Sequence, residues 1–584
     1  MPRTPLSYDN AGIASVLDEI GDLLELKGEN VFRAVTYRAA ARAIRDLRSP
    51  LKDYMEAGTL ESIPKVGKSV KDVIEQLLTT GTATRHEELR AAVPDGLLTL
   101  LRVPGVGPST ARTIYDHLKI TTIDELEEAA KSGRLRQLPK IQAKTEENIL
   151  KSIASFRSRT GRSLIVDAQA AANAILEWLQ NEATFDRITV AGSLRRWRET
   201  IGDIDVLVAS ADAAPIMAAF TRAPTVERVL ANGETKSSVV IDRGLQIDLR
   251  VVPLASWGAA QMYFTGSKEH NVRLRGIALR KKLLLNEYGL YRVGEEKTGT
   301  PVASRTEEEI YAVLGMEWIP PELREDHGEI DAAVAHKLPA LVEVADITGD
   351  LHTHSNWTDG RDPIIDMARR ARDKGYAYMA LTDHSVGLGM TQGLNVERIA
   401  ARSAEIAKVN RELAPFRVLI GTEVDIRANG NLDYPDELLA QFDIVTASVH
   451  SAFSQPRAQM TRRIIGAMEH PLVDAISHPT GRLLEKRDPY DVDMTALIDA
   501  AVRTRTRLEV NGGPERLDLP DICVHEALEK GAELVISSDA HRVEELEWMA
   551  LGVATARRGW TTKKSVANTR SLDEIMGSRK RAER

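Results

Sequence analysis

The C-terminal half of the chain contains short apolar runs that are each followed by a histidine, an aspartate or a glutamate. The candidate metal ligands are His352, His354, Asp359, His384, Glu423, His450, His478, Asp539 and His541. A lone buried histidine is usually a core residue with a satisfied hydrogen bond, but packing does not explain so many in one layout. Mixed imidazole and carboxylate ligands suit Zn²⁺, Mn²⁺ or Fe²⁺ and not Ca²⁺. The set predicts two or three ions, which would activate water against phosphate esters.

A second group of carboxylates lies in the middle of the chain. Asp203 and Asp205 are two residues apart in a strand-like run, so their side chains point to one face. Asp248 lies in another alternating run. Three carboxylates on adjacent strands can hold two Mg²⁺ or Mn²⁺ ions, which activate an attacking hydroxyl and stabilise a leaving pyrophosphate. Asp-x-Asp alone is common in surface strands, but the turn at Gly192 and Ser193 upstream makes the pattern much more specific.

Two glycine-containing turns, IPKVGKS at 63–69 and VPGVGPS at 103–109, each precede an amphipathic helix. They resemble the helix-hairpin-helix element, in which glycines bring the backbone close to a phosphate and helix N-terminal amides point at the anion. Such contacts do not depend on base sequence. The first turn departs from the motif because a lysine replaces its first glycine. The predicted DNA-binding residues are Lys65, Gly67, Lys68, Gly105 and Gly107.

The composition is that of an ordinary globular protein, with 43% hydrophobic and 28% charged residues and a net charge of −8. A single cysteine, Cys523, excludes an intrachain disulfide and a cysteine-based zinc site. No apolar run approaches the roughly 18 residues of a transmembrane helix. The first residues lack the apolar core of a secretory signal. We therefore expect a cytoplasmic, nucleoid-associated monomer that makes no membrane contact.

The elements that must position these residues divide the chain into seven parts. We predict helical domains over 1–90 and 91–160, an α/β domain over 161–255, mixed helix and turn over 256–320, a linker with one helix over 321–345, alternating strands and helices over 346–575, and a charged, disordered tail over 576–584. The predicted strands are Arg187–Ala191, Asp205–Ala209, Ser238–Ile241 and Leu245–Val252, then Tyr378–Leu381, Val418–Ile420, Ile444–Val449, Ala475–Ser477, Arg507–Val510 and Leu534–Ser537. The last part predicts a (β/α) barrel-like domain with its ligands at the strand ends.

The segment YFTGSKEHN, at 263–271, is similar to the thumb motif of DNA polymerase beta and its relatives in family X. The resemblance runs from about residue 8 to 320 in the order of that family. It implies a multidomain protein with all-α helix-hairpin-helix domains, a nucleotidyltransferase palm over 161–255 and an α+β thumb over 256–320. It also implies that Asp203, Asp205 and Asp248 are the catalytic metal ligands.

The same resemblance assigns contacts with the nucleotide and the DNA. It implies Gly192, Ser193 and Arg196 at the triphosphate, Tyr263, Phe264 and Gly266 beneath the sugar, Asn271 at the incoming base, and Arg275 on the template strand. One position departs from the family: the Schiff-base lysine of its lyase domain corresponds to Val73. Because a lyase needs an amine in a defined pocket, deoxyribose-phosphate lyase activity is not expected.

The histidine-rich region resembles the PHP (polymerase and histidinol phosphatase) domain, and every metal-ligand position of that domain is occupied. The resemblance implies a Mn²⁺-dependent or Zn²⁺-dependent 3′→5′ exonuclease, with 3′-phosphatase or AP-endonuclease activity as further options. His470 and His525 lie outside the strand-end motifs and are expected to be structural. Arg482 is expected to help bind phosphate.

These features predict a DNA polymerase that fills short gaps during repair and also processes 3′ ends. Its partners would be gapped or primer-template DNA and dNTPs. One alternative is a phosphatase of a small metabolite within the PHP superfamily, which would have no use for two DNA-binding hairpins. Another is a DNA-binding scaffold with only nuclease activity, which would not need an intact set of three aspartates.

Overall fold

The structure, a computed structural model, divides into two compact units, Met1–Thr160 and Gly161–Arg584. It describes the chain except for residues 1–9, 30, 46, 48–50, 102, 104, 140, 160–161, 242–243, 296–298, 388–391 and 581–584. The first unit has one hydrophobic core, and the second has separate cores in its α/β, thumb and barrel parts. Among the described residues, no helix has both the length and the apolar character needed to span a membrane.

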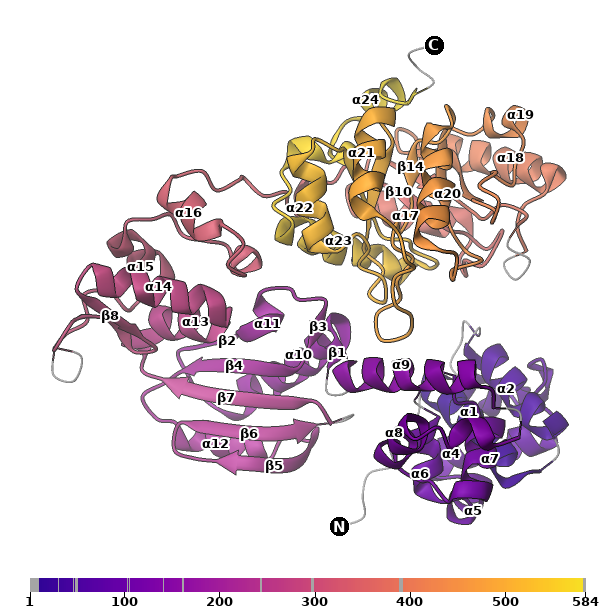
Figure 1. The fold of residues 1–584 in the computed structure, drawn as a ribbon, viewed down its shortest axis with the longest axis horizontal. Helices are drawn as coiled ribbons and strands as arrows, with labels where there is room; N and C mark the ends of the chain where they lie inside the picture. The colour runs from indigo at the N-terminus through magenta and orange to yellow at the C-terminus, as the bar shows by residue number, and fades with distance from the viewer. Residues whose placement is uncertain are drawn as a thin grey trace. The chain divides into compact units, whose positions relative to one another are not determined.

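The first unit is helical (Figure 1). Its α-helices are α1 (Asn10–Lys27), α2 (Val31–Arg45), α3 (Leu51–Glu56), α4 (Lys68–Thr80), α5 (Thr84–Ala92), α6 (Asp95–Leu100), α7 (Pro108–Leu118), α8 (Ile123–Lys131) and α9 (Ala143–Arg159). Helix α4 shows why the sequence folds this way: Val70, Val73, Ile74 and Leu77 recur at helical spacing and are all buried. Val73 therefore lies in the core of this unit, where a lysine amine would have no access to a substrate.

Both predicted hairpins share one backbone turn, and a third copy follows them. The closing hydrogen bonds are Val66 N to Ile63 O (3.1 Å), Val106 N to Val103 O (3.0 Å) and Ile141 N to Leu138 O (3.2 Å). Gly105 has φ +87°, and Lys65 takes the same left-handed conformation at φ +68°. The lysine thus adopts the backbone shape for which the motif ordinarily uses glycine. Sequence analysis missed the third turn because LPKIQ contains no glycine.

The palm part of the second unit is a five-stranded sheet in the order β2-β4-β7-β6-β5. Its elements are α10 (Ile165–Glu182), β2 (Arg187–Val190), α11 (Gly192–Arg195), β4 (Asp203–Ala209), α12 (Ala214–Thr221), β5 (Val226–Asn232), β6 (Lys236–Ile241) and β7 (Gln246–Val252). Helices α10 and α12 pack on the sheet and bury its apolar side chains. The central pair, β4 and β7, is parallel and places Asp205 opposite Asp248. The fold thus brings the predicted carboxylates onto neighbouring strands.

The thumb part contains α13 (Trp257–Thr265), α14 (Lys268–Arg280), β8 (Leu283–Asn286), β9 (Gly289–Arg292) and α15 (Glu307–Leu314). A buried ion-pair network joins it to the palm. Glu307 accepts hydrogen bonds from Arg195 at 2.8 and 2.9 Å and from Arg324 at 2.7 and 3.0 Å. Burial raises the pKa of Glu307, but the charges of Arg324 and Arg195 outweigh it and hold that pKa far below its usual range. The carboxylate therefore stays ionised and fixes the turn after Gly192 against the thumb.

The segment over 321–345, predicted as a linker with one helix, packs against the domains around it. It contains one α-helix, α16 (Glu329–Val334), as expected. Arg324 is completely buried, and its guanidinium binds Glu307. Glu322 accepts a hydrogen bond from Arg557 at 2.8 Å. These contacts make the segment an integral part of the second unit.

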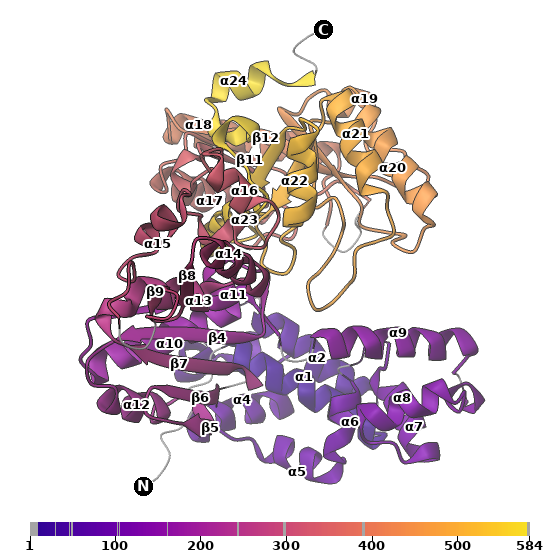
Figure 2. The same cartoon turned by 60° about the vertical axis from the view of Figure 1, so that its left-hand side comes forward.

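The C-terminal part is a parallel barrel whose helices lie outside its strands (Figures 1 and 2). The strands run in sequence order as β10 (Gly349–Thr353), β11 (Tyr378–Leu381), β12 (Arg417–Asp425), β13 (Ile444–Ser448), β14 (Ala475–Ile476), β15 (Arg507–Asn511) and β16 (Leu534–Ser537). Hydrogen bonds from Asp539 N to His352 O and from His354 N to Ala540 O join the two ends of the sheet. Strands buried on both faces form continuous apolar runs, which explains why the sequence revealed them.

The helices of the barrel are α17 (Ile364–Asp373), α18 (Val396–Glu412), α19 (Asp436–Leu439), α20 (Arg457–Glu469), α21 (Met494–Thr504), α22 (Asp521–Glu529), α23 (Met549–Arg558) and α24 (Leu572–Gly577). The predicted disordered tail over 576–584 begins inside α24. Arg579 donates to Asp443 O at 2.9 Å, and Lys580 donates to Met468 O at 2.7 Å. This part of the tail is therefore held on the barrel, and residues 581–584 lie outside the described residues.

Candidate metal centres and nucleic-acid interface

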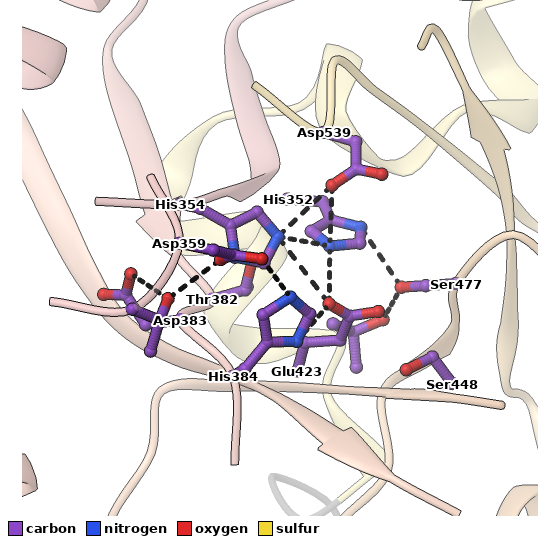
Figure 3. Close-up of polar contacts among 12 residues, drawn as sticks. His352, His354, Asp359, Thr382, Asp383, His384, Glu423, Ser448, Ser477 and Asp539 are labelled. Atoms are coloured by element: carbon purple, nitrogen blue, oxygen red, sulfur yellow. Dashed lines mark hydrogen bonds and ion pairs between the residues drawn. The ribbon is translucent and has the colours of Figure 1, made fainter. Parts of the chain in front are cut away.

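The predicted ligands of the barrel converge at the carboxyl ends of its strands (Figure 3). Three groups have ligand atoms within 4.8 Å of one another: His354, Asp359, His384 and His541; His352, His354 and Asp539; and His384, Glu423 and His450. The ninth predicted residue, His478, joins them through a 2.9 Å contact between its Nε2 and Glu423 Oε1. The structure thus brings the whole predicted set into one cluster.

Glu423 occupies the centre of this cluster and is almost completely buried. Its carboxylate oxygens lie near the imidazole nitrogens of His352 (3.4 Å), His354 (3.6 Å), His384 (3.0 Å), His450 (3.4 Å) and His478 (2.9 Å). Burial raises the pKa of Glu423, but the charges of His384, His450 and His352 outweigh burial and hold that pKa well below its usual range. The carboxylate is therefore an anion that several cationic groups can share.

The histidines of the cluster fit divalent cations. His352 Nε2 and His354 Nε2 approach to 3.1 Å, so both nitrogens point at one location. Nδ1 of His354 and Nδ1 of His478 are buried and have no hydrogen-bond partner in the described part of the chain. Burial lowers the pKa of both imidazoles to about 4. Both rings are therefore neutral near pH 7, which is the form that binds metal.

Buried polar groups that the sequence analysis missed orient these ligands. His352 Nδ1 lies 2.6 Å from Glu509 Oε1, and His450 Nδ1 lies 3.2 Å from the Ser448 hydroxyl and 3.6 Å from Asp425 Oδ1. Partners of this kind fix the ring orientation and tautomer of a ligating histidine. The only sequence signal for Glu509 was a charge inside the apolar run RLEVN. A charged residue in such a run gives no indication of what it contacts.

Three other predictions concerned residues around the cluster. Arg482, expected to help bind phosphate, donates to Glu199 Oε2 at 2.7 Å and to Arg516 O at 2.9 Å. Its guanidinium thus holds protein groups together. His470 Nε2 lies 3.1 Å from Asp436, and His525 Nε2 lies 3.7 Å from Glu529. Neither histidine belongs to the close groups of described ligands, in accordance with a structural role.

Two of the palm carboxylates, Asp205 and Asp248, line a small cavity of about 80 Å³ with Ala191, Lys236 and Phe264 among its walls. Asp205 and Asp248 are cross-strand neighbours, and Asp203 lies two residues before Asp205 on β4, opposite Gln246. Burial and the charges of Asp203 and Asp248 raise the pKa of Asp205 to about 7. The three carboxylates do not form one of the close ligand groups found among the described residues. Their mutual repulsion nevertheless makes the site suited to cations.

Gly192 allows the turn before α11 to approach Asp205. Its φ is +61°, and a Cβ atom at this position would lie 2.1 Å from Asp205 Oδ2. Such a contact is impossible without displacing the carboxylate. Glycine is therefore required both for the backbone conformation and for the space that the Asp205 carboxylate occupies.

Two further side chains hold Asp248, and the sequence analysis missed both. Gln246 donates to Asp248 Oδ1 at 2.7 Å, and Lys236 Nζ lies 3.2 Å from Asp248 Oδ2. Burial raises the pKa of Asp248, but the hydrogen bonds from Gln246, Ser238 and Lys236 outweigh burial and lower it. Asp248 is therefore ionised when Asp205 is not, and the two carboxylates differ in basicity.

Of the predicted nucleotide contacts, Phe264 lines this cavity, and the others lie on or beside α11, α13 and α14. The rings of Tyr263 and Phe264 are 5.2 Å apart in an edge-to-face arrangement. Gly266 ends α13 with φ +72°, and Asn271 donates to Tyr263 O at 2.7 Å. Arg196 binds Glu325 Oε1 at 3.0 Å and Thr265 O. Arg196 thus has protein partners that a triphosphate would have to replace, whereas Ser193, on α11, remains a predicted ligand.

The predicted DNA contacts lie on exposed surface. Gly67 and Gly107 are the N-cap residues of α4 and α7, and neither end has a side-chain capping hydrogen bond. A Cβ atom at Gly67, Gly105 or Gly107 would meet no atom within 4 Å. Lys68 is exposed, and so is Arg275 on α14 in the second unit. Two uncapped helix N-termini with open space in front of them are suited to bind phosphate groups.

Comparisons with known proteins agree with these sites. Family models match the "DNA polymerase beta thumb" at 260–325, the "PHP domain" at 350–486, a helix-hairpin-helix domain at 8–83 and a SAM-like helix-hairpin-helix tandem at 97–155. The chain is 38% identical over 572 residues to "DNA polymerase/3′-5′ exonuclease PolX" of Bacillus subtilis, covering 97% of this chain and 99% of that protein.

Two other relatives match parts of the chain. DNA polymerase lambda of Rattus norvegicus is 24% identical over 348 residues, which cover 54% of this chain and 56% of that protein. A protein named as a probable phosphatase from Caldanaerobacter subterraneus is 28% identical over 203 residues, which cover 33% of this chain and 75% of that protein. The phosphatase likeness therefore accounts for only a third of the chain.

The close approach of Gly192 to Asp205 yields a testable prediction. Gly192→Ala should reduce template-directed primer extension by about 100-fold, since a displacement of about 1 Å in a catalytic group has effects of this size. Gly276→Ala is the matched control because its Cβ atom would come no closer than 3.8 Å to Arg280. Steady-state extension of a labelled primer measures both variants. Full activity of Gly192→Ala would show that the approach does not constrain the site.

Proposed function

The chain belongs to the family X DNA polymerases that carry a PHP domain, and we propose that it fills short gaps in DNA during repair. It is a DNA-directed DNA polymerase with 3′→5′ exonuclease activity. The observation that carries this assignment is the likeness along nearly the whole chain to a polymerase that is also an exonuclease. Gap filling is our inference from the helix-hairpin-helix elements, which suit binding of DNA backbone on both sides of a short gap.

For synthesis, we assign Asp203, Asp205 and Asp248 as the ligands of two Mg²⁺ or Mn²⁺ ions. When bound, such ions promote attack by the primer 3′-hydroxyl and stabilise the pyrophosphate that leaves. Lys236 and Gln246 keep Asp248 in place. Burial and the charges of Asp203 and Asp248 raise the pKa of Asp205, and cations bound between these carboxylates would relieve that repulsion.

Residues of α11 and the thumb position the nucleotide in this proposal. Ser193 and Arg196 bind the triphosphate, for which Arg196 exchanges its contact with Glu325. Tyr263 and Phe264 lie under the sugar, and Asn271 contacts the base. The buried ion pair between Arg195 and Glu307 holds α11 against the thumb. The role of these residues is thus to align the α-phosphate with the primer terminus.

For hydrolysis, we assign the barrel cluster as the site of two or three Mn²⁺ or Zn²⁺ ions. When bound, such ions activate water against the 3′-terminal phosphodiester. Glu423 supplies the central carboxylate, and Glu509 fixes the orientation of His352. Ser448 holds the ring of His450, and Asp425 accepts a hydrogen bond from its backbone N–H. Glu423 is almost completely buried, whereas Asp359 and His541 are each 31% exposed, so water and substrate would reach the site from their side.

The partners that follow from this function are gapped or primer-template DNA and dNTPs. A cytoplasmic location next to the nucleoid is proposed because DNA is the substrate. The monomeric state remains a prediction. A small-metabolite phosphatase is the weaker alternative, since such an enzyme would leave the palm cavity and the hairpins without a use.

Two separable activities are the main prediction. An end-labelled primer on a one-nucleotide gap should lengthen with Mn²⁺ and dNTPs and shorten with Mn²⁺ alone. Asp205→Asn should abolish lengthening and leave shortening, because it removes a palm ligand only. His352→Ala should do the reverse, because it removes a barrel ligand only. A denaturing gel measures lengthening and shortening of the primer for each of the two variants.

Loss of both activities in either single variant would contradict two independent sites. A primer that neither lengthens nor shortens with the wild-type protein would contradict the DNA assignment, and small phosphate esters would then be the substrates to try. Arg503→Ala on α21 is a control, since Arg503 is 58% exposed and its partner, Glu469 at 3.0 Å, is not a proposed ligand.

A separate prediction concerns the lyase reaction. Val73 is only 2% exposed, so the helix position that carries the family's reactive amine faces the core. Borohydride trapping with DNA that ends in a 5′-deoxyribose phosphate should give no covalent adduct with this chain. A trapped adduct that disappears in Lys68→Ala or Lys71→Ala would contradict the prediction and identify the amine.

A further inference from the structure

Arg516 lies beside the metal-ligand cluster and has an unused hydrogen-bond donor. Its Nε lies 3.3 Å from Asp539 Oδ2. Its NH1 is buried and has no hydrogen-bond partner within the described part of the chain. The side chain as a whole is 21% exposed, so the guanidinium also reaches the accessible edge of the site. A buried donor left unpaired costs about 1–3 kcal/mol, and proteins rarely keep such a donor without a functional reason.

The loop that carries Arg516 is fixed to the cluster. Arg516 N donates to Gly513 O at 2.8 Å, and Gly513 N donates to Asn511 Oδ1 at 2.8 Å. The amide of Asn511 donates to Asp539 Oδ2 at 3.0 Å. Arg482, from another loop, donates to Arg516 O at 2.9 Å. These bonds hold the backbone of Arg516 in place, and the contact with Asp539 positions its guanidinium.

Electrostatics also tie Arg516 to the site. Oδ1 of Asp539 lies 3.4 Å from His352 and 3.2 Å from His354. Its Oδ2 contacts Asn511 and Arg516. Asp539 thus lies between Arg516 and the histidines. An anion that touches the proposed ions would be within the field of this guanidinium.

An ion pair with Asp539 alone does not account for these features. That contact uses Nε and leaves NH1 without a partner. Arg482 shows what a purely structural arginine looks like in this region. Its guanidinium donates hydrogen bonds to Glu199 and to main-chain carbonyls. The planar fork of arginine matches two oxygens of a phosphate group. The free donor of Arg516 is therefore available to an acceptor that comes from outside the chain.

We propose that Arg516 binds a non-bridging oxygen of the phosphate ester that is hydrolysed in the barrel, which for a DNA substrate is the 3′-terminal phosphodiester. The inference rests on the proposed function and adds a substrate-binding residue to it. It assigns phosphate recognition to Arg516 in place of Arg482. The sequence gave no sign of this role, because Arg516 follows no strand end and belongs to none of the motifs.

The test uses the full-length protein loaded with Mn²⁺ and measures binding of thymidine 5′-monophosphate and of inorganic phosphate by calorimetry. Arg516→Gln should weaken binding of both by about tenfold or more, since one charge-assisted hydrogen bond is lost. Manganese content should stay at the wild-type level. The exonuclease KM should rise in parallel. Arg457→Gln is the matched control, because Arg457 is 58% exposed and pairs only loosely with Asp493, at 3.4 Å.

Unchanged phosphate affinity in Arg516→Gln would overturn the inference. If that variant loses manganese or fails to fold, Arg516→Lys decides, because lysine keeps the charge beside Asp539 but has no planar fork. Binding at least about threefold weaker than wild type supports the inference, and wild-type binding overturns it. If the wild-type protein with Mn²⁺ binds neither phosphate compound, the proposed function of the barrel fails, and not the role of Arg516 alone.

Discussion

The ionised carboxylate of Glu423 is buried at the end of β12 and surrounded by the imidazoles of five histidines. Taking a carboxylate out of water costs several kcal/mol unless cations compensate for it. The barrel is built to meet this condition, because parallel strands bring residues that are distant in the sequence to one end. Each strand contributes a ligand or a residue that orients one. The closure of the barrel between β10 and β16 then places Asp539 beside His352 and His354.

The palm also brings carboxylates close together in a partly buried site, and it has fewer neighbouring groups to compensate their charge. Asp205 and Asp248 are neighbours on parallel strands, and the repulsion between them and Asp203 raises the pKa of Asp205. Lys236 relieves part of that repulsion at Asp248. Gly192 gives the space, and the buried Glu307 network keeps the turn and the thumb together. Both sites of the enzyme are thus concentrations of negative charge that the fold holds in place for metal ions.

Much of this arrangement could be predicted from the sequence, for physical reasons. Strands β11 and β16 have the predicted bounds, because strands buried on both faces are continuous apolar runs. The barrel ligands were visible because each follows such a run. Strand β5 was missed because it is largely exposed and carries no apolar pattern. Glu509, Asp425 and Arg516 were missed because their roles depend on contacts between distant strands and loops, which spacing does not reveal.

The hairpins show the limit of motif reasoning in another way. Lys65 seemed to weaken the first turn, yet its backbone takes the left-handed conformation that Gly105 takes in the second. The geometry of the turn therefore depends on its hydrogen bond and on the helix that follows more than on glycine. The third turn, which ends at Ile141, has the same hydrogen bond and no glycine.

The most direct test of the account is to locate manganese in crystals of the full-length protein by anomalous scattering, for the wild type and for Glu423→Gln. The account predicts peaks among the barrel histidines around Glu423 in the wild type. In the variant these peaks should weaken or vanish, while any peak at Asp205 and Asp248 persists. Barrel peaks of equal strength in both proteins would contradict the central place given to Glu423. So would a wild-type crystal that shows a manganese peak in the palm and no peak in the barrel.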